Sequence, residues 1–159
     1  MRDYKNITAY KMADELAVKT YRLTRDFPKE ELYGLTSQLR RAAISVPSNI
    51  AEGASRQHKR DYLNFLFIAR GSLAEVEYLL HLARRLGYLG EAEHERIDGL
   101  RQQVAKTLFG LIGAVEREAK PLLRMLGVLS VFGLANLIRS LVFGPWSLVQ
   151  TMVSPRVSG

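Results

Sequence analysis

The chain contains no cysteine among its 159 residues, which removes several kinds of chemistry at once. Disulfides, thiolate nucleophiles and cysteine-ligated zinc are all excluded, and this absence suits a reducing cytoplasm. The polar N-terminus, MRDYKNITAYKMADE, also lacks the basic stub and apolar run of a secretory signal. We therefore expect a cytoplasmic protein.

Sequence patterns for catalysis are equally scarce. There is no glycine-rich phosphate loop, no cofactor fingerprint and no Ser-His-Asp candidate set. One Glu-x-x-His occurs, from Glu91 to His94, but a di-iron site needs two such pairs and further glutamates from neighbouring helices. We therefore predict no metal, no cofactor and no enzymatic activity.

Acidic residues are missing from the last quarter of the chain. The sequence has 23 Lys+Arg and 16 Asp+Glu, a net charge of +7, and every acid lies before residue 120. Residues 1–119 are only mildly basic at +3, with 19 Lys+Arg against 16 Asp+Glu, and residues 120–159 add +4. Net charge alone is thus weak support for nucleic-acid binding, so the argument depends on clusters.

Strand-like alternation is absent too, and apolar residues instead recur every three or four positions, as in amphipathic helices. We expect four helices, at about residues 8–26, 31–54, 57–86 and 91–119, with Ser55 as the N-cap of the third. Because the connections are short, the fold class we predict is all-α, an antiparallel up-and-down four-helix bundle over residues 1–119.

The third helix carries the most regular apolar row. Seven of its residues alternate at four- and three-residue spacing, the seam of a left-handed helix pair: Tyr62, Leu66, Ala69, Leu73, Val76, Leu80 and Ala83. A second row, which includes Ile68 and Leu86, widens the apolar face, so this helix contacts either a second helix of the bundle or another subunit. Gly71 in mid-helix is expected to let another backbone approach closely.

The second helix contains the most informative segment, LRRAAISVPSNIAEG, at residues 39–53. Pro47 lacks a backbone donor and its ring clashes with the carbonyl four residues back, so the helix should kink or restart there. Nearby serine or asparagine side chains should then satisfy the freed backbone, and Gly53 is a plausible helix end. We interpret Pro47, Asn49, Glu52 and Gly53 as structural residues.

Residues 120–159 are a different kind of sequence. Pro121 interrupts the pattern of the fourth helix, and residues 125–138 and 141–155 contain no charge. The first uncharged run is shorter than the roughly 20 residues that span a membrane. Three interpretations stay open for this apolar C-terminal extension: contact with a membrane, an added helix packed on the bundle or at an oligomer interface, and a poorly structured tail.

Two long segments carry a family resemblance, FPKEELYGLTSQLRRAAISVPSNIAEG at residues 27–53 and IARGSLAEVEYLL at residues 68–80. They resemble the four-helix-bundle family of 23S rRNA intervening-sequence proteins, over about residues 7–119. The resemblance implies a homo-oligomer, typically a pentameric ring, whose basic surface is proposed to contact RNA or DNA. The same superfamily includes the accessory variability determinant of diversity-generating retroelements, a partner of a reverse transcriptase. No established biochemical activity is implied.

Basic residues cluster in the second helix and again around the start of the third, where cations oppose the helix macrodipole. The candidates for phosphate contact are Arg40, Arg41, Arg56, Lys59 and Arg60. We expect a non-enzymatic, oligomeric binding or scaffold protein that engages RNA or a ribonucleoprotein through them. The competing hypothesis is a purely structural homo-oligomer, in which the arginines form salt bridges between subunits and the tail mediates membrane or subunit contact.

Overall fold

A computed structural model describes the backbone of residues 3–143 and the side chains of residues 3–118. Within that range the chain is helical, with four α-helices, two short 3-10 helices and no strand. Two units make up the chain, residues 1–119 and residues 120–159.

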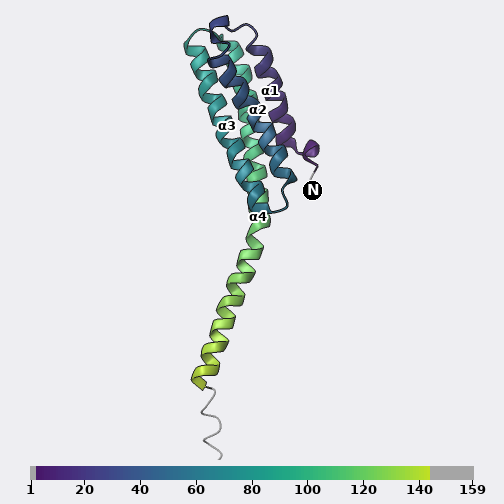
Figure 1. The fold of residues 1–159 in the computed structure, drawn as a ribbon, viewed down its shortest axis with the longest axis vertical. Helices are drawn as coiled ribbons and strands as arrows, with labels where there is room; N and C mark the ends of the chain where they lie inside the picture. Colours follow the sequence, from purple (N-terminus) through teal and green to yellow (C-terminus); the bar gives the residue numbers. More distant parts are fainter. Residues whose placement is uncertain (1–2, 144–159) are drawn as a thin grey trace, which may run out of the picture. The chain divides into compact units, whose positions relative to one another are not determined.

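The first unit is an antiparallel four-helix bundle (Figure 1). Its helices are α1 (Thr8–Leu23), α2 (Leu35–Ser55), α3 (Lys59–Arg85) and the first part of α4 (Glu91–Phe143). The 3-10 helix η1 (Tyr4–Asn6) precedes α1, and η2 (Lys29–Glu31) lies in the link between α1 and α2. The prediction of an all-α, antiparallel four-helix bundle is confirmed.

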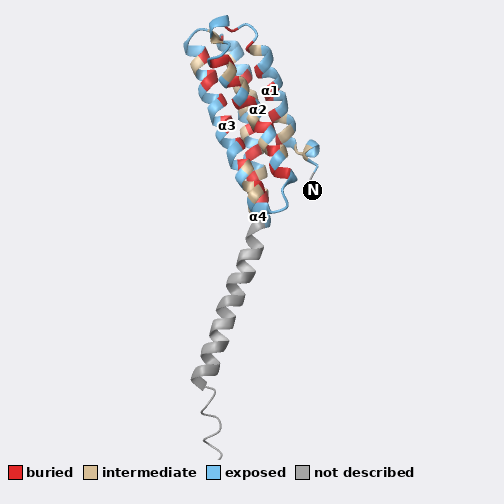
Figure 2. Cartoon of the chain, in the orientation of Figure 1, coloured by how far each residue is buried: buried red, intermediate tan, exposed pale blue. Residues whose placement is uncertain are grey.

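The inward faces of the four helices form one apolar core (Figure 2). All seven residues of the predicted seam on α3 are buried, and none exposes more than 4% of its surface. Burial of a large apolar side chain to this extent stabilises a fold by about 1.5–3 kcal/mol. Leu16 of α1, Leu39 of α2 and Leu108 of α4 complete the same core. The predicted burial of this row is therefore confirmed.

Two helix starts differ from the prediction. α2 begins at Leu35 rather than near Glu31, and the Glu31 carboxylate accepts a hydrogen bond from the Leu35 N–H at 2.9 Å, which satisfies a free donor of the first turn. Ser55 does not cap α3, because its hydroxyl donates to the Glu52 carbonyl in the last turn of α2, at 2.6 Å. His58 occupies the N-cap position of α3 without a side-chain cap hydrogen bond.

A glycine turn joins α3 to α4. Gly87 has a φ of 77°, in the left-handed region that glycine adopts without a Cβ penalty. Its N–H donates to the Arg84 carbonyl and the Tyr88 N–H donates to the Ala83 carbonyl, each at 3.0 Å. This pair of bonds is a Schellman motif, which satisfies the last carbonyls of α3 and reverses the chain.

α2 runs without interruption through Pro47, so the helix does not restart there, and the kink stays a prediction. The Asn49 side-chain amide donates to the Ser45 carbonyl at 2.7 Å and to the Ser45 hydroxyl at 3.0 Å. The Ser45 hydroxyl lies 2.8 Å from the Ser72 hydroxyl of α3, which donates to the Ile68 carbonyl at 3.1 Å. These side chains hold the backbone beside the proline and join α2 to α3.

α4 continues to Phe143, so the predicted helix end near residue 119 is wrong for the backbone. Pro121 removes only one hydrogen bond, and the leucines and arginine that follow it favour helix. The other predictions for the apolar extension concern side chains beyond residue 118 and residues 144–159, which lie outside the described residues. Among the helices that the structure describes, none is long and apolar enough to cross a membrane.

Candidate functional site

The two adjacent arginines of α2 face different neighbours. Arg40 turns toward the end of α1, where its Nε donates to Thr24 Oγ1 at 2.7 Å and its Nη2 donates to the Thr24 carbonyl at 3.3 Å. Its guanidinium also lies over the Tyr21 ring, 4.9 Å from the centroid. Two hydrogen bonds and a cation–π contact give this half-buried side chain a structural role.

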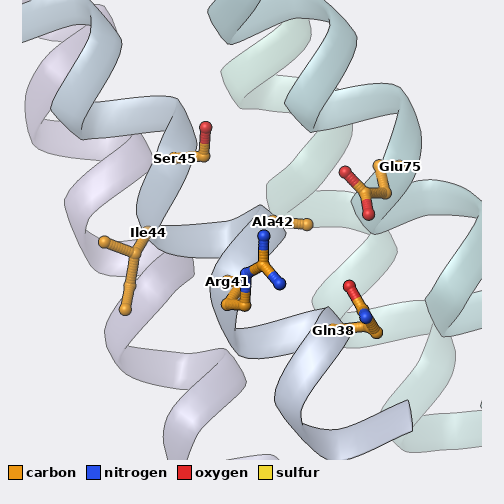
Figure 3. Close-up of a pocket in the computed structure, with 6 residues that line it drawn as sticks. All are labelled: Gln38, Arg41, Ala42, Ile44, Ser45 and Glu75. Atoms are coloured by element: carbon orange, nitrogen blue, oxygen red, sulfur yellow. The ribbon is translucent and has the colours of Figure 1, made fainter. Parts of the chain in front are cut away.

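Arg41 is exposed and lines a shallow groove of about 310 Å³ between α2 and α3. Figure 3 shows its guanidinium extending into the groove beside the Gln38 amide, with the Glu75 carboxylate coming from α3. No ion pair of Arg41 occurs among the described side chains. A guanidinium in this state is available to bind an anion.

Arg56 and Lys59 lie together where α2 passes into α3, and each already has an acidic partner. Arg56 pairs with Glu52 one turn earlier, and its guanidinium lies 4.7 Å from the centroid of the Phe65 ring. Lys59 reaches across to α4, where its Nζ lies 3.4 Å from the Glu118 carboxylate and donates to the Glu118 carbonyl at 3.1 Å. Both side chains are nevertheless about half exposed.

Arg60, the last of the five predicted contacts, is exposed and makes no ion pair within residues 3–118. It lies one residue beyond Lys59 at the same end of the bundle. Arg41 is 15 residues before Arg56, which at 1.5 Å per residue places it roughly 22 Å away along α2. The five predicted residues therefore do not form one surface. Arg56, Lys59 and Arg60 lie together at one end of the bundle, Arg41 lies in the groove between α2 and α3, and Arg40 bonds to Thr24.

The two glycines predicted to be structural differ in their surroundings. A Cβ on Gly53 would lie 2.7 Å from Tyr62 Cδ2 and 2.9 Å from Phe65 Cβ, so this glycine permits the close approach of α2 and α3. α2 continues two residues beyond Gly53, so the glycine does not end the helix. A Cβ on Gly71 would meet no atom within 4 Å, so the expected close backbone approach is not made within the described part of this chain.

An ion-pair network between α3 and α4 was missed by the sequence reasoning. Glu77 pairs with Arg101 of α4 at 3.2 Å, and the Asp98 carboxylate accepts hydrogen bonds from Arg101 and from Gln102. Burial by itself would raise the pKa of Asp98, but these hydrogen bonds and the charges of Arg101 and His94 together lower it. The described residues contain no group of three or more side chains that could hold a metal ion.

A second missed group lies on the outward side of α3 and α4. The Arg70 guanidinium lies 4.9 Å from the centroid of Phe67 and 6.0 Å from the centroid of Phe109. Neither ring belongs to the apolar rows that predict the core, and that mismatch is the signal in the sequence that could have identified them.

The fold and this surface define an all-α four-helix-bundle protein with exposed basic groups. Residues 5–110 match the family described as 23S rRNA-intervening sequence protein, and the chain belongs to that family. The resemblance seen in the sequence is thereby confirmed.

A solved structure with the same fold is that of a protein with unknown function from the S23 ribosomal protein family of Bacteroides thetaiotaomicron VPI-5482. The two sequences are 27% identical, and the match covers 66% of this chain and 95% of the Bacteroides chain, with a TM-score of 0.62. No curated protein matches the chain.

Proposed function

We propose that this protein is a non-enzymatic, homo-oligomeric binding protein that contacts RNA through exposed arginines. One observation carries the proposal. Arg41 and Arg60 present exposed guanidiniums without an acidic partner among residues 3–118, in a member of a family named for a 23S rRNA intervening sequence. Guanidiniums bind phosphate oxygens through bidentate, charge-assisted hydrogen bonds. Neither the family name nor the description of the structural neighbour indicates an enzymatic reaction.

Arg56 and Lys59 extend this surface, because an RNA phosphate can replace the carboxylate that each of them now pairs with. Their ion pairs with Glu52 and Glu118 are half exposed, and surface pairs of this kind contribute only about 0–1 kcal/mol. Replacing a carboxylate with a phosphate therefore costs little free energy. We leave Arg40 outside the proposed surface, because two of its donors are bound to Thr24 and its guanidinium lies over the Tyr21 ring.

Self-association is supported by aliphatic side chains that the bundle leaves uncovered. Val18 of α1, Ile44 of α2, Ile68 of α3 and Leu86, the residue after α3, are each at least 39% exposed. We propose that other copies of the chain cover these residues in a ring, which would remove their apolar surface from water. Native mass spectrometry of the full chain should show a mass of several subunits, and we expect five. A monomer at every concentration would contradict self-association.

A titration of the full chain against a fluorescein-labelled RNA hairpin tests the RNA contact. We expect binding in low salt that weakens steeply between about 50 and 200 mM monovalent salt, because phosphate contacts release counterions. Arg41→Gln and Arg60→Gln should each reduce the slope of log K against log salt by about 1. Absence of hairpin binding at the lowest salt would contradict the proposed function.

Arg25→Gln is the matched control for these variants. Arg25 is exposed just beyond the end of α1, has no ion pair in the part of the chain that the structure describes, and lies outside the proposed surface. Its substitution removes the same charge and should leave the salt slope unchanged. A DNA hairpin of the same sequence measures the preference for RNA.

A further inference from the structure

Two large aromatic rings stay exposed on neighbouring helices of the bundle. Phe67 of α3 is 37% exposed and Phe109 of α4 is 58% exposed. The Arg70 guanidinium lies 4.9 Å from the first centroid and 6.0 Å from the second. One planar cation therefore contacts two rings, and no acid pairs with it among the described side chains.

Cations continue this surface along both helices. Arg60 precedes Phe67 by seven residues, or about two turns, so the two lie on the same side of α3. Lys106 and Arg117 are eleven residues, or about three turns, apart on one side of α4. All three cations are exposed, and none forms an ion pair within residues 3–118. The aromatic cluster thus has positive charge beside it on both helices.

A glycine follows Arg70 on α3 and another follows Phe109 on α4, so no side chain covers the surface at these two positions. A Cβ on Gly71, the residue after Arg70, would meet no atom within 4 Å, and the same holds for Gly110, the residue after Phe109. No side chain therefore rises beside the guanidinium at either position, and a flat group can approach it from solvent.

We infer that this side of α3 and α4 binds unpaired RNA bases, which stack on Phe67, Arg70 and Phe109. The flanking cations Arg60, Lys106 and Arg117 contact the phosphates of the same strand. Proteins that bind single strands combine these two elements, because every base has a π-face and every linkage carries a negative charge. The inference rests on the proposed RNA contact and specifies an unpaired segment as the part of the RNA that is held.

Charge complementarity favours RNA over a second copy of the chain on this surface. In a two-fold contact between copies, the same cations of both copies would meet across the interface, and like charges there oppose association. A single strand supplies flat rings and negative charge together. A two-fold contact between copies on this surface is therefore disfavoured. We place the ring contacts proposed above, which join two different faces of each copy, on the faces that carry Val18, Ile44, Ile68 and Leu86.

The test compares a labelled single-stranded RNA containing 2-aminopurine with a blunt RNA duplex of equal length, using the full chain. Phe67→Leu and Phe109→Leu keep an apolar side chain but remove the ring, and Arg70→Lys keeps the charge but removes the planar group. Each variant should bind the single strand about ten-fold more weakly. The salt slope should stay unchanged, because no phosphate contact is lost. Duplex binding should stay unchanged, because paired bases are stacked within the helix.

Two further variants and one spectroscopic signal make the comparison specific. The fluorescence of 2-aminopurine should be quenched in the wild-type complex and should recover with Phe109→Leu, whereas Phe109→Tyr, which keeps a ring, should restore quenching and affinity. Tyr33→Leu is the matched control, since Tyr33 is 90% exposed between η2 and α2, away from this surface, and its removal should change neither readout. Thermal melts by circular dichroism establish that each variant is folded.

The outcomes separate this inference from the proposed function. If the wild type binds both RNAs and the three variants bind the single strand equally well, the stacking surface is refuted and the RNA contact stands. If the wild type binds no RNA in low salt, both are refuted. If the variants change the subunit number in native mass spectrometry and leave RNA affinity unchanged, the surface is a subunit interface and the inference is overturned.

Discussion

Gly53→Ala is expected to destabilise the protein, although alanine is the better helix former. The added Cβ would lie 2.7 Å from Tyr62 Cδ2 and 2.9 Å from Phe65 Cβ. The Tyr62 side chain is 4% exposed and the Phe65 atom belongs to the start of its side chain, so neither moves without shifting the α2–α3 contact. Overpacking of this kind costs about 1–3 kcal/mol, whereas helix propensity returns about 0.5–1 kcal/mol. The net loss is about 1 kcal/mol.

Gly71→Ala provides the matched control with the opposite sign. The same Cβ placed in the middle of α3 meets no atom within 4 Å, so only helix propensity acts and the variant should gain about 0.5–1 kcal/mol. The two variants should therefore differ by about 2 kcal/mol in their free energy of unfolding. A difference of this size exceeds the error of the measurement.

Urea unfolding of the full chain, followed by far-UV circular dichroism at one protein concentration, measures both variants. The reasoning about Gly53 is refuted if its alanine variant is as stable as the parent or more so. A destabilised Gly71→Ala variant would show instead that another backbone packs closely against this glycine, as the sequence pattern predicts.

Two further predictions concern the polar contacts between helices. Ser72→Ala removes the hydroxyl that lies 2.8 Å from Ser45 Oγ and should lower the free energy of unfolding by about 1 kcal/mol. Ser48→Ala, at an exposed position, is the control and should change the free energy of unfolding little. Equal effects of the two variants in urea melts would argue against the contact. Because the folded-state pKa of Asp98 is lowered from 3.8, its carboxylate stabilises the protein above that pH, and the stabilisation is lost as pH falls through the folded-state value. Asp98→Asn should therefore be less stable than the parent at pH 7, and the gap should narrow below about pH 4; a gap independent of pH would contradict this account.

The bundle could be predicted from the sequence because helical periodicity reports burial directly. The row from Tyr62 to Ala83 is buried as its spacing requires. Helix ends were less predictable, because they depend on polar side chains that can form hydrogen bonds with the backbone of either neighbouring helix. Ser55, for example, bonds back to Glu52 rather than forward to α3, and both choices suit its sequence position equally well.

The candidate site was predictable only as a set of charges. Spacing along one helix cannot show that Arg40 meets Thr24 of α1 or that Lys59 meets Glu118 of α4, because such pairs depend on how helices pack. The Phe67, Arg70 and Phe109 cluster is likewise assembled from two helices. Periodicity indicates that these rings lie outside the core but cannot indicate that both lie near the Arg70 guanidinium.

The hydroxyl contact between Ser45 and Ser72 also fixes the register of α2 against α3. Apolar rows on two helices can match again after a slide of one turn, about 5.4 Å, because leucine, valine and alanine accept many neighbours. The contact between the two hydroxyls is specific to one alignment, since such a slide would separate them and remove the hydrogen bond between the helices. One pair of serines thus distinguishes a single alignment from the alternatives that the apolar pattern would tolerate.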